Sequence, residues 1–399
     1  MAGRRATAAA RCPPCSTAGG TDGTGDDTSI RFMRQTQYSA MQRCKYFMNR
    51  RRRRSPPATL RETGFERLFD IYFAREINCV LYFAYEISSR SEAPMTAQPI
   101  EFSAADGYTL HGTLWSPDTE PRALVLIHPA TAVPERLYAG FARFLTGRGF
   151  AALTYNYRGI GTSRPARLAA LRARMRDWME LDVGGATAWA RQTYEGLPLL
   201  AVGHSVGGHA IGLSASTTHL RAAVLVAAHA GSTRLITQAA ERLKVRLILR
   251  VVGPLMSALL GYVPGKQLGL GEDLPAGVFR EWSRWTTLPH YFFDDPTLGA
   301  AERYAKQQLP ILALGFDDDP WANPGAIGLL VSYLTRAAVE RRQIDPHAAG
   351  SGPVGHMGFF RSRPGTVLWP DVADWLARAI EPPRGASRPS LSIAAGNPA

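Results

Sequence analysis

The chain has 399 residues, of which 45% are hydrophobic, so it is long enough to bury a large core and to form two or three domains. Its 46 Lys and Arg residues against 33 Asp and Glu residues give a formal net charge of +13. No uninterrupted apolar run is long enough to cross a bilayer, so the sequence predicts no stable membrane insertion.

Residues 1–94 form an Arg-rich N-terminal extension that contains five consecutive arginines, Arg50 to Arg54. Such a run could contact nucleic acid or anionic lipid, but we favour a solvated, disordered arm and expect no nucleic-acid partner. Met95 stands directly before the first recognisable strand. The extension is therefore interpreted as disordered or as a mis-assigned start of the chain.

All four cysteines, which are Cys12, Cys15, Cys44 and Cys79, lie in this extension. Cys12 and Cys15 have the spacing of a metal or redox pair, but no second pair or histidine cluster accompanies them. We therefore expect no metal site and no cofactor. The rest of the chain needs no disulfide, which suits a reducing cytoplasm and predicts a cytoplasmic protein.

From residue 99 onward, short apolar runs alternate with helical segments, which is the pattern of an α/β fold. We expect a mostly parallel eight-stranded sheet with helices on both faces, opened by a hairpin at Asp106-Gly107. The runs that predict strands are Ile100–Ser103, Thr109–Leu114, Ala123–Ile127, Phe150–Thr154, Leu199–Val202, Ala222–Val226 and Ile311–Leu314. The expected helices are Glu135–Thr146, Leu168–Gln192, one after Ser205, Pro324–Val339 and Asp371–Ile380.

One interval interrupts this alternation, because about 80 residues separate Gly231 from Leu309 where one helix would suffice. We predict a helical cap insertion at 233–308, called the cap segment below, between core parts 95–232 and 309–381. Residues 382–399, rich in Pro, Ser, Gly and Ala, are expected to be a disordered tail. Trp282, Trp285 and Tyr291 are candidates for an apolar substrate pocket under the cap. The alternatives are that these aromatic residues fill the cap's own core, or that the cap rests on a membrane.

Gly203-His204-Ser205-Val206-Gly207 lies between a predicted buried strand and a predicted helix. A G-x-S-x-G motif in this position is typical of a nucleophile elbow, in which glycine neighbours leave room for a strained serine. A serine hydroxyl is a weak nucleophile until a base contacts it and a third group orients that base. Ser205 is therefore the candidate nucleophile.

The chain order of an elbow-type hydrolase is Ser, then an acid, then His, and this sequence supplies it. The strand Ile311–Leu314 is followed by Asp317, Asp318 and Asp319, any one of which could accept a hydrogen bond from a histidine. His356 follows between Gly355 and Gly358, in a loop flexible enough to reach the serine. His356 is the candidate general base.

The oxyanion of the reaction needs aligned donors. The backbone N–H groups of Val206, at the start of the next helix, and of Ala130, after Pro129, are the candidates. His128 is expected to brace this loop by hydrogen bonding, and His209 to pack or to form a local hydrogen bond. Asp182 or Asp345 with His347 would be a second acid–histidine pair, but in a poorer chain order.

From about residue 99 to 381 the chain resembles the α/β-hydrolase superfamily, and within it a group related to serine aminopeptidase-like and lysophospholipase-like enzymes. The motifs that carry the resemblance are His128-Pro129, Tyr157 to Ser163, Gly203 to Gly208, Gly315 to Pro320 and Gly355 to Phe359. The resemblance implies a Ser-Asp-His triad. It selects Asp318 as the acid, because relatives commonly place the acid three residues after the strand-end glycine. Many relatives have His-Gly where this chain has His128-Pro129, which implies a stiffer oxyanion loop.

The sequence thus predicts a serine hydrolase that cleaves an ester, thioester or similar acyl compound through an acyl-enzyme, with a small, apolar acyl substrate as its partner. An acyltransferase with the same triad is the alternative, because exclusion of water by the cap decides between hydrolysis and transfer. A binding protein that kept the fold without the chemistry is a third interpretation.

Overall fold

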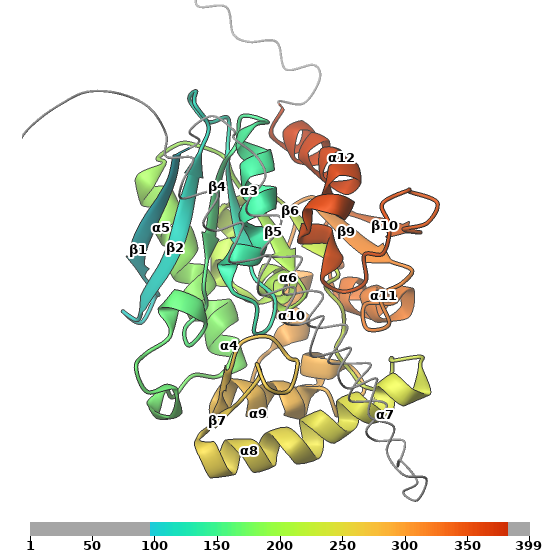
Figure 1. Cartoon of the computed structure of the whole chain (residues 1–399). Helices are drawn as coiled ribbons and strands as arrows, with labels where there is room; N and C mark the ends of the chain where they lie inside the picture. Colours follow the sequence, from blue (N-terminus) through green and yellow to red (C-terminus); the bar gives the residue numbers. More distant parts are fainter. Residues whose placement is uncertain (1–95, 382–399) are drawn as a thin grey trace, which may run out of the picture. The chain divides into compact units, whose positions relative to one another are not determined.

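The computed structural model describes residues 96–381, and the predictions about residues 1–94 and the tail from 382 lie outside the described residues. An eight-stranded sheet forms the centre of the described part, in the order β1-β2-β4-β3-β5-β6-β9-β10 (Figure 1). The first three strands in that order pair antiparallel, and all the others pair parallel. The strands are β1 (Thr96–Ser103), β2 (Thr109–Ser116), β3 (Leu124–His128), β4 (Ala151–Tyr155), β5 (Leu199–His204), β6 (Leu220–Val226), β9 (Ile311–Phe316) and β10 (Val339–Ile344).

The central strands β3, β4, β5 and β9 are buried at every residue, as near-continuous apolar runs predict for parallel strands covered on both faces. Helices α3 and α12 contact each other on one side of the sheet, and α5 lies on the other side (Figure 1). The core helices are α3 (Ala139–Thr146), α4 (Met175–Asp177), α5 (Val183–Thr193), α6 (Val206–Leu213), α11 (Pro324–Ser332) and α12 (Ser362–Ile380).

The α/β fold and the eight-stranded sheet are confirmed, but three predicted helices have different bounds. The helix predicted over 324–339 ends at Ser332, and Val339 begins the edge strand β10. The helix predicted from Leu168 begins only at Met175, after a 3-10 turn. Helix α12 begins at Ser362 and continues through Pro370, because its buried face packs Trp369 against Phe141 and Phe144 of α3.

The cap segment contains one long helix made of α7 (Ala239–Leu247), the π-helical turn η6 (Ile248–Val252) and α8 (Gly253–Leu260). The junction residues Ile248 and Val252 keep helical backbone angles, so the helix is continuous. The remaining elements are the two-stranded β7 (Tyr262–Val263) and β8 (Leu274–Pro275), α9 (Ala276–Trp285), the 3-10 turn η7 (Tyr291–Asp294) and α10 (Ala300–Ala305). No helix among residues 96–381 is long and apolar enough to span a membrane.

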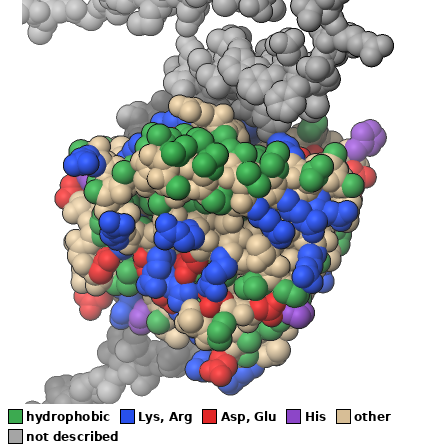
Figure 2. Space-filling view, turned by 90° about the horizontal axis from the view of Figure 1, so that it is seen from below, with side chains coloured by type: hydrophobic (Ala, Val, Ile, Leu, Met, Phe, Trp, Pro, Cys, Tyr) green, Lys and Arg blue, Asp and Glu red, His purple; other side chains and the backbone are tan. Residues whose placement is uncertain are grey.

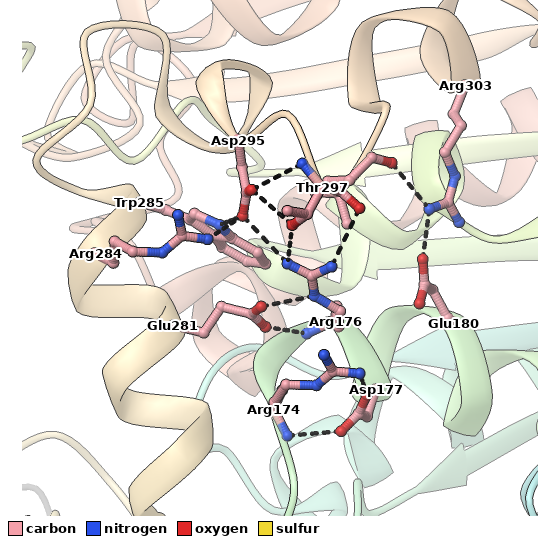
Figure 3. A network of polar contacts seen from close by, with 11 residues as sticks. Arg174, Arg176, Asp177, Glu180, Glu281, Arg284, Trp285, Asp295, Thr297 and Arg303 are labelled. Atoms are coloured by element: carbon pink, nitrogen blue, oxygen red, sulfur yellow. Dashed lines mark hydrogen bonds and ion pairs between the residues drawn. The ribbon is translucent and has the colours of Figure 1, made fainter.

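A buried ionic network joins the cap segment to the core (Figure 3). Arg176 of α4 donates from Nε to Glu281 of α9 at 2.6 Å and from Nη2 to Asp295 at 3.2 Å. Asp295 also pairs with Arg284 and accepts from the Trp285 indole N–H at 2.7 Å. Burial alone would raise the pKa of Asp295, but hydrogen bonds from Trp285 and Thr297 and the charge of Arg284 lower it to about 2. The carboxylate is therefore charged at neutral pH and fixes α9 in place.

Candidate active site

The residues Gly203 to Gly207 form a sharp strand-to-helix turn between β5 and α6. Ser205 has a φ of 51° and a ψ of −112°, which is strained backbone for a residue with a side chain. The two glycines permit this turn, since a Cβ on Gly203 would meet the backbone of Gly207 and Gly208, and one on Gly207 would overlap the His128 carbonyl. The turn exposes the Ser205 hydroxyl to a cavity while the residue stays buried.

Ser205, His356 and Asp319 form a continuous chain of hydrogen bonds. His356 Nε2 lies 3.1 Å from Ser205 Oγ, and His356 Nδ1 lies 2.7 Å from Asp319 Oδ2. A carboxylate can only accept, so Nδ1 carries the ring proton and Nε2 presents its lone pair to the serine hydroxyl. This is the tautomer in which a histidine can take a proton from serine.

The acid in contact with His356 is Asp319, and the selection of Asp318 is corrected. The Asp318 carboxylate accepts instead from the backbone N–H groups of Val354 and Gly355, both at 2.8 Å, so it anchors the loop that carries His356. The exposed Asp317 accepts from the Gln343 amide at the sheet edge. The tight turn after β9, closed by a hydrogen bond from Asp319 N–H to the Phe316 carbonyl, decides which carboxylate faces inward.

Asp319 is held as an anion although its side chain is fully buried. Burial alone would raise its pKa, but the charge and hydrogen bond of His356 and the N–H of Trp321 hold the pKa well below its ordinary value. Its other oxygen accepts from the Trp321 and Ala322 N–H groups at 2.9 and 3.1 Å. Asp319 is thus fixed in orientation and can stabilise a positive charge on His356.

Of the two N–H groups predicted as oxyanion donors, that of Ala130 already donates to another residue. Val206 is the first residue of α6, where the helix dipole favours negative charge, and it lines the cavity beside Ser205. Ala130 also lines the cavity, but its N–H donates to the Tyr138 hydroxyl at 2.8 Å, so the prediction of a free donor there is corrected. His128, expected to brace this loop by hydrogen bonding, contacts the Tyr155 hydroxyl on β4 at 2.8 Å.

Tyr138 and His204 connect this loop to the backbone of His356. The His356 carbonyl can only accept, so His204 donates to it from Nε2 at 2.8 Å and accepts from the Tyr138 hydroxyl at Nδ1. Burial lowers the pKa of His204 to about 3, which keeps its ring neutral, as these contacts require. This network could not be predicted from the sequence, because its partners are 66 and 152 residues apart.

A mostly apolar cavity of about 300 Å³ opens on Ser205 and His356. The cap segment covers it with the inner faces of its helices, among them Val245 and Leu249 of the long helix. Trp282 and Tyr291 line it, as expected. Trp285 does not belong to the lining: it is fully buried against Tyr291 and Phe292, and the prediction that it contributes to the pocket is wrong.

Other lining residues were missed from the sequence, above all Trp321, whose ring lies 5.5 Å from that of His356, and His229, whose ring lies 5.3 Å from it. Trp321 directly follows the loop that contains Asp317, Asp318 and Asp319, and this position could have predicted that it lies near His356. His229 follows β6 and had no such signal. Burial lowers the pKa of His229 to about 4, so it is a neutral polar group in the cavity at pH 7.

The remaining polar candidates are structural. His209 packs against Tyr291 and Phe292, as predicted, and donates to the His229 carbonyl at 2.8 Å. Asp182 pairs with Arg158 at 2.6 Å rather than with a histidine. Asp345 accepts from the backbone N–H of His347, not from its ring. Among residues 96–381, no group of three or more His, Cys, Asp or Glu could hold a metal ion.

Comparisons with known proteins concern the fold and the family of the chain. The model of the family described as "Serine aminopeptidase, S33" matches residues 119–297, a range that includes the elbow but ends before Asp319 and His356. With the sheet order and the elbow, this match places the chain in the α/β-hydrolase superfamily. The protein is a hydrolase with the α/β-hydrolase fold. None of the curated proteins compared with the chain matches it.

Solved structures similar to the chain share little sequence with it. An esterase of Pyrococcus furiosus is 14% identical, with a TM-score of 0.49 and coverage of 73% of this chain and 96% of its own. An esterase domain from Rhodothermus marinus is 17% identical, with a TM-score of 0.47 and coverage of 72% and 100%. The α/β-hydrolase GrgF from Penicillium is 17% identical, with a TM-score of 0.49 and coverage of 72% and 99%.

Proposed function

We propose that this protein is a serine esterase that cleaves an ester, thioester or similar acyl compound through an acyl-enzyme. The observation that supports the proposal most directly is the Ser205–His356–Asp319 chain, with contacts of 3.1 and 2.7 Å. A cysteine-free sequence from residue 80 onward suits a reducing compartment, so we place the enzyme in the cytoplasm.

In the proposed mechanism Ser205 Oγ attacks the carbonyl carbon of the substrate while His356 Nε2 takes the hydroxyl proton. Asp319 stabilises the resulting imidazolium, and the Val206 N–H at the start of α6 donates to the oxyanion. When the carbonyl re-forms, the C–O or C–S bond breaks and His356 returns its proton to the leaving group. Water then attacks the acyl-enzyme with His356 again as base, which releases the acid and restores Ser205.

The cavity supports an apolar acyl group as the substrate portion bound next to Ser205. Its lining combines aliphatic side chains from the cap segment with the indole rings of Trp282 and Trp321. The polar residues in the lining include neutral His229, Ser232 and Thr233. An acyl chain that fills such a cavity gains about 0.8 kcal/mol for each CH₂ it buries.

The test is hydrolysis of a series of p-nitrophenyl esters of increasing acyl length by the full chain. We expect kcat/KM to rise with chain length until the cavity is filled, and Ser205→Ala to abolish hydrolysis of every ester. Ser214→Ala is the matched control, because Ser214 is a buried serine that does not line the cavity. Hydrolysis that survives in Ser205→Ala would refute the proposal.

Acyl transfer through the same triad is distinguished in the same assay by adding an alcohol acceptor. A hydrolase yields the free acid as its main product, whereas a transferase yields mainly the new ester. Trp282→Ala should raise KM for the long-chain p-nitrophenyl esters more than for p-nitrophenyl acetate, because Trp282 lines the cavity. An equal effect on all chain lengths would remove Trp282 from the acyl site.

A further inference from the structure

The outer face of the long helix in the cap segment, residues 239–260, is apolar and exposed. Seven large hydrophobic side chains among residues 96–381 are strongly exposed, and six of them lie on this helix. They are Leu243, Leu247, Val251, Leu255, Leu259 and Leu260. A contiguous exposed apolar surface of this kind marks an interaction site, because single exposed hydrophobic residues are usually scattered.

The opposite face of the same helix is fixed to the protein. Val245 and Leu249 are buried and line the cavity, and Gly253 is buried against the Phe279 ring of α9. The outward leucines are therefore not the inner face of a helix that has swung away from the core. The helix is therefore apolar on two sides, and only the side with Val245 and Leu249 packs against the rest of the protein.

The π-helical turn η6 keeps the outward side chains in one row. Residues four apart drift by about 40° around a regular α-helix, so a series from Leu243 to Leu259 would wind away from one face. The wider π turn at 248–252 offsets part of this drift. The row extends for about 24 Å along the helix axis, at about 1.5 Å per residue.

Basic side chains accompany this row. Residues 239–260 contain Arg242, Lys244, Arg246 and Arg250 against the single acid Glu241, a net charge of +3. Figure 2 shows the hydrophobic side chains as a continuous band across one face, with Lys and Arg side chains beside it. An amphipathic helix with apolar residues on one side and basic residues at its margin is suited to an anionic membrane surface.

We propose that this outer face, formed by the six exposed residues and the basic residues beside them, binds peripherally to membranes that contain anionic phospholipid. The helix lies parallel to the bilayer surface, its leucines reach the boundary of the acyl chains, and its arginines contact the lipid phosphates. The cavity lies directly behind this helix, on the side of Val245 and Leu249.

Two protein segments could also cover this face, a second copy of the chain or the N-terminal extension, and the charge of each argues against it. A second copy of the chain, paired helix to helix, would bring two surfaces of net charge +3 together. The N-terminal extension 1–94 has a net charge of +7, which is not complementary to that of the helix. A membrane with anionic headgroups has the complementary charge.

The test is co-sedimentation of the full chain with vesicles of phosphatidylcholine alone or mixed with phosphatidylglycerol. We expect binding to the anionic vesicles that weakens with added salt. The double variant Leu243→Glu/Leu255→Glu should bind at least tenfold more weakly, because each leucine contributes about tenfold or more when it leaves water. Val367→Glu is the matched control, since Val367 is the one strongly exposed large hydrophobic residue outside the helix in residues 96–381. Residues 1–94 have a net charge of +7 in every variant, so the difference between variant and wild type, rather than vesicle binding itself, measures the contribution of the helix.

Hydrolysis of a short, soluble ester and thermal denaturation serve as folding controls, because Leu243 and Leu255 do not line the cavity. Equal partitioning of the double variant and the wild type would overturn the proposal, as would equal binding to neutral and anionic vesicles. Size-exclusion chromatography with light scattering tests whether a second copy of the chain covers this face. A wild-type dimer that the double variant dissociates into monomers would also overturn it.

Discussion

Replacement of Asp319 by Asn tests which of three adjacent carboxylates orients His356. The side-chain oxygen of the new amide would still accept from the Trp321 and Ala322 N–H groups, which the carboxylate binds at 2.9 and 3.1 Å. Its NH₂ group would then face His356 Nδ1, the atom 2.7 Å from the carboxylate in the structure. An amide that donates to Nδ1 forces the ring proton onto Nε2, which faces Ser205, so the ring can no longer accept the serine proton.

The expected result for Asp319→Asn is a loss of about 10,000-fold in kcat, as for a triad whose histidine has the wrong tautomer. Asp318→Asn is the matched control, because Asp318 contacts only the backbone N–H groups of Val354 and Gly355. It should lose less than about tenfold in kcat and about 1–3 kcal/mol of stability. Hydrolysis of p-nitrophenyl butyrate gives kcat, and urea denaturation gives stability. The reverse ranking of the two variants in kcat would refute this assignment.

Three further predictions concern the scaffold. Gly207→Ala should abolish activity or folding, since its Cβ would overlap the His128 carbonyl. Gly184→Ala is the control in helix α5, because its Cβ would meet only the Ala105 Cβ, at an ordinary contact distance of 3.9 Å, and it should unfold at the wild-type temperature or a higher one. A Gly207→Ala variant with wild-type activity and melting temperature would contradict this. Arg176→Met should lower the free energy of unfolding by about 3–5 kcal/mol in urea titrations, because it leaves buried Glu281 and Asp295 without their shared partner; a change below about 1 kcal/mol would show that the network contributes little. Burial lowers the pKa of four histidines to about 3 or 4, namely His128, His204, His209 and His229. Their pKa is about 6.5 in the unfolded chain, so below that pH the unfolded chain binds protons that the folded chain does not. The free energy of unfolding is therefore highest above pH 6.5 and decreases as the pH falls toward 4. Between pH 7 and 5.5 each histidine lowers the free energy of unfolding by about 1.2 kcal/mol, and the four together lower it by about 5 kcal/mol; urea midpoints that do not change over this range would contradict this.

The features predicted correctly from the sequence are those with local causes. The elbow depends on residues within five positions, and the central strands are apolar on both faces, so short windows of sequence carry both signals. Strand β10 was missed because it lies at the sheet edge and carries the exposed polar pattern Val339–Ile344, which looks like the end of the preceding helix. The last helix was predicted to begin at Asp371, but it begins at Ser362 and continues through Pro370, with Trp369 packed against Phe141.

The features predicted wrongly depend on side-chain direction or on partners far away in the chain. The choice between Asp318 and Asp319 depends on the turn after Phe316, which rotates successive side chains to different sides. Trp282 and Trp285 are three residues apart on α9, yet only Trp282 reaches the cavity, because Trp285 is turned toward Asp295. The Ala130 N–H donates to the hydroxyl of Tyr138 in the following helical turn, and no pattern in the sequence predicts this contact.

The most direct test of the proposed mechanism is mass spectrometry of the full chain after reaction with a fluorophosphonate. This reagent forms a stable phosphonyl ester only with a serine that a neighbouring base activates. The contact between Ser205 and His356 predicts one adduct per chain, located on the peptide that contains Ser205, absent from Ser205→Ala and strongly slowed in Asp319→Asn. An adduct on another residue, or full labelling of Ser205→Ala, would contradict a nucleophile at the elbow.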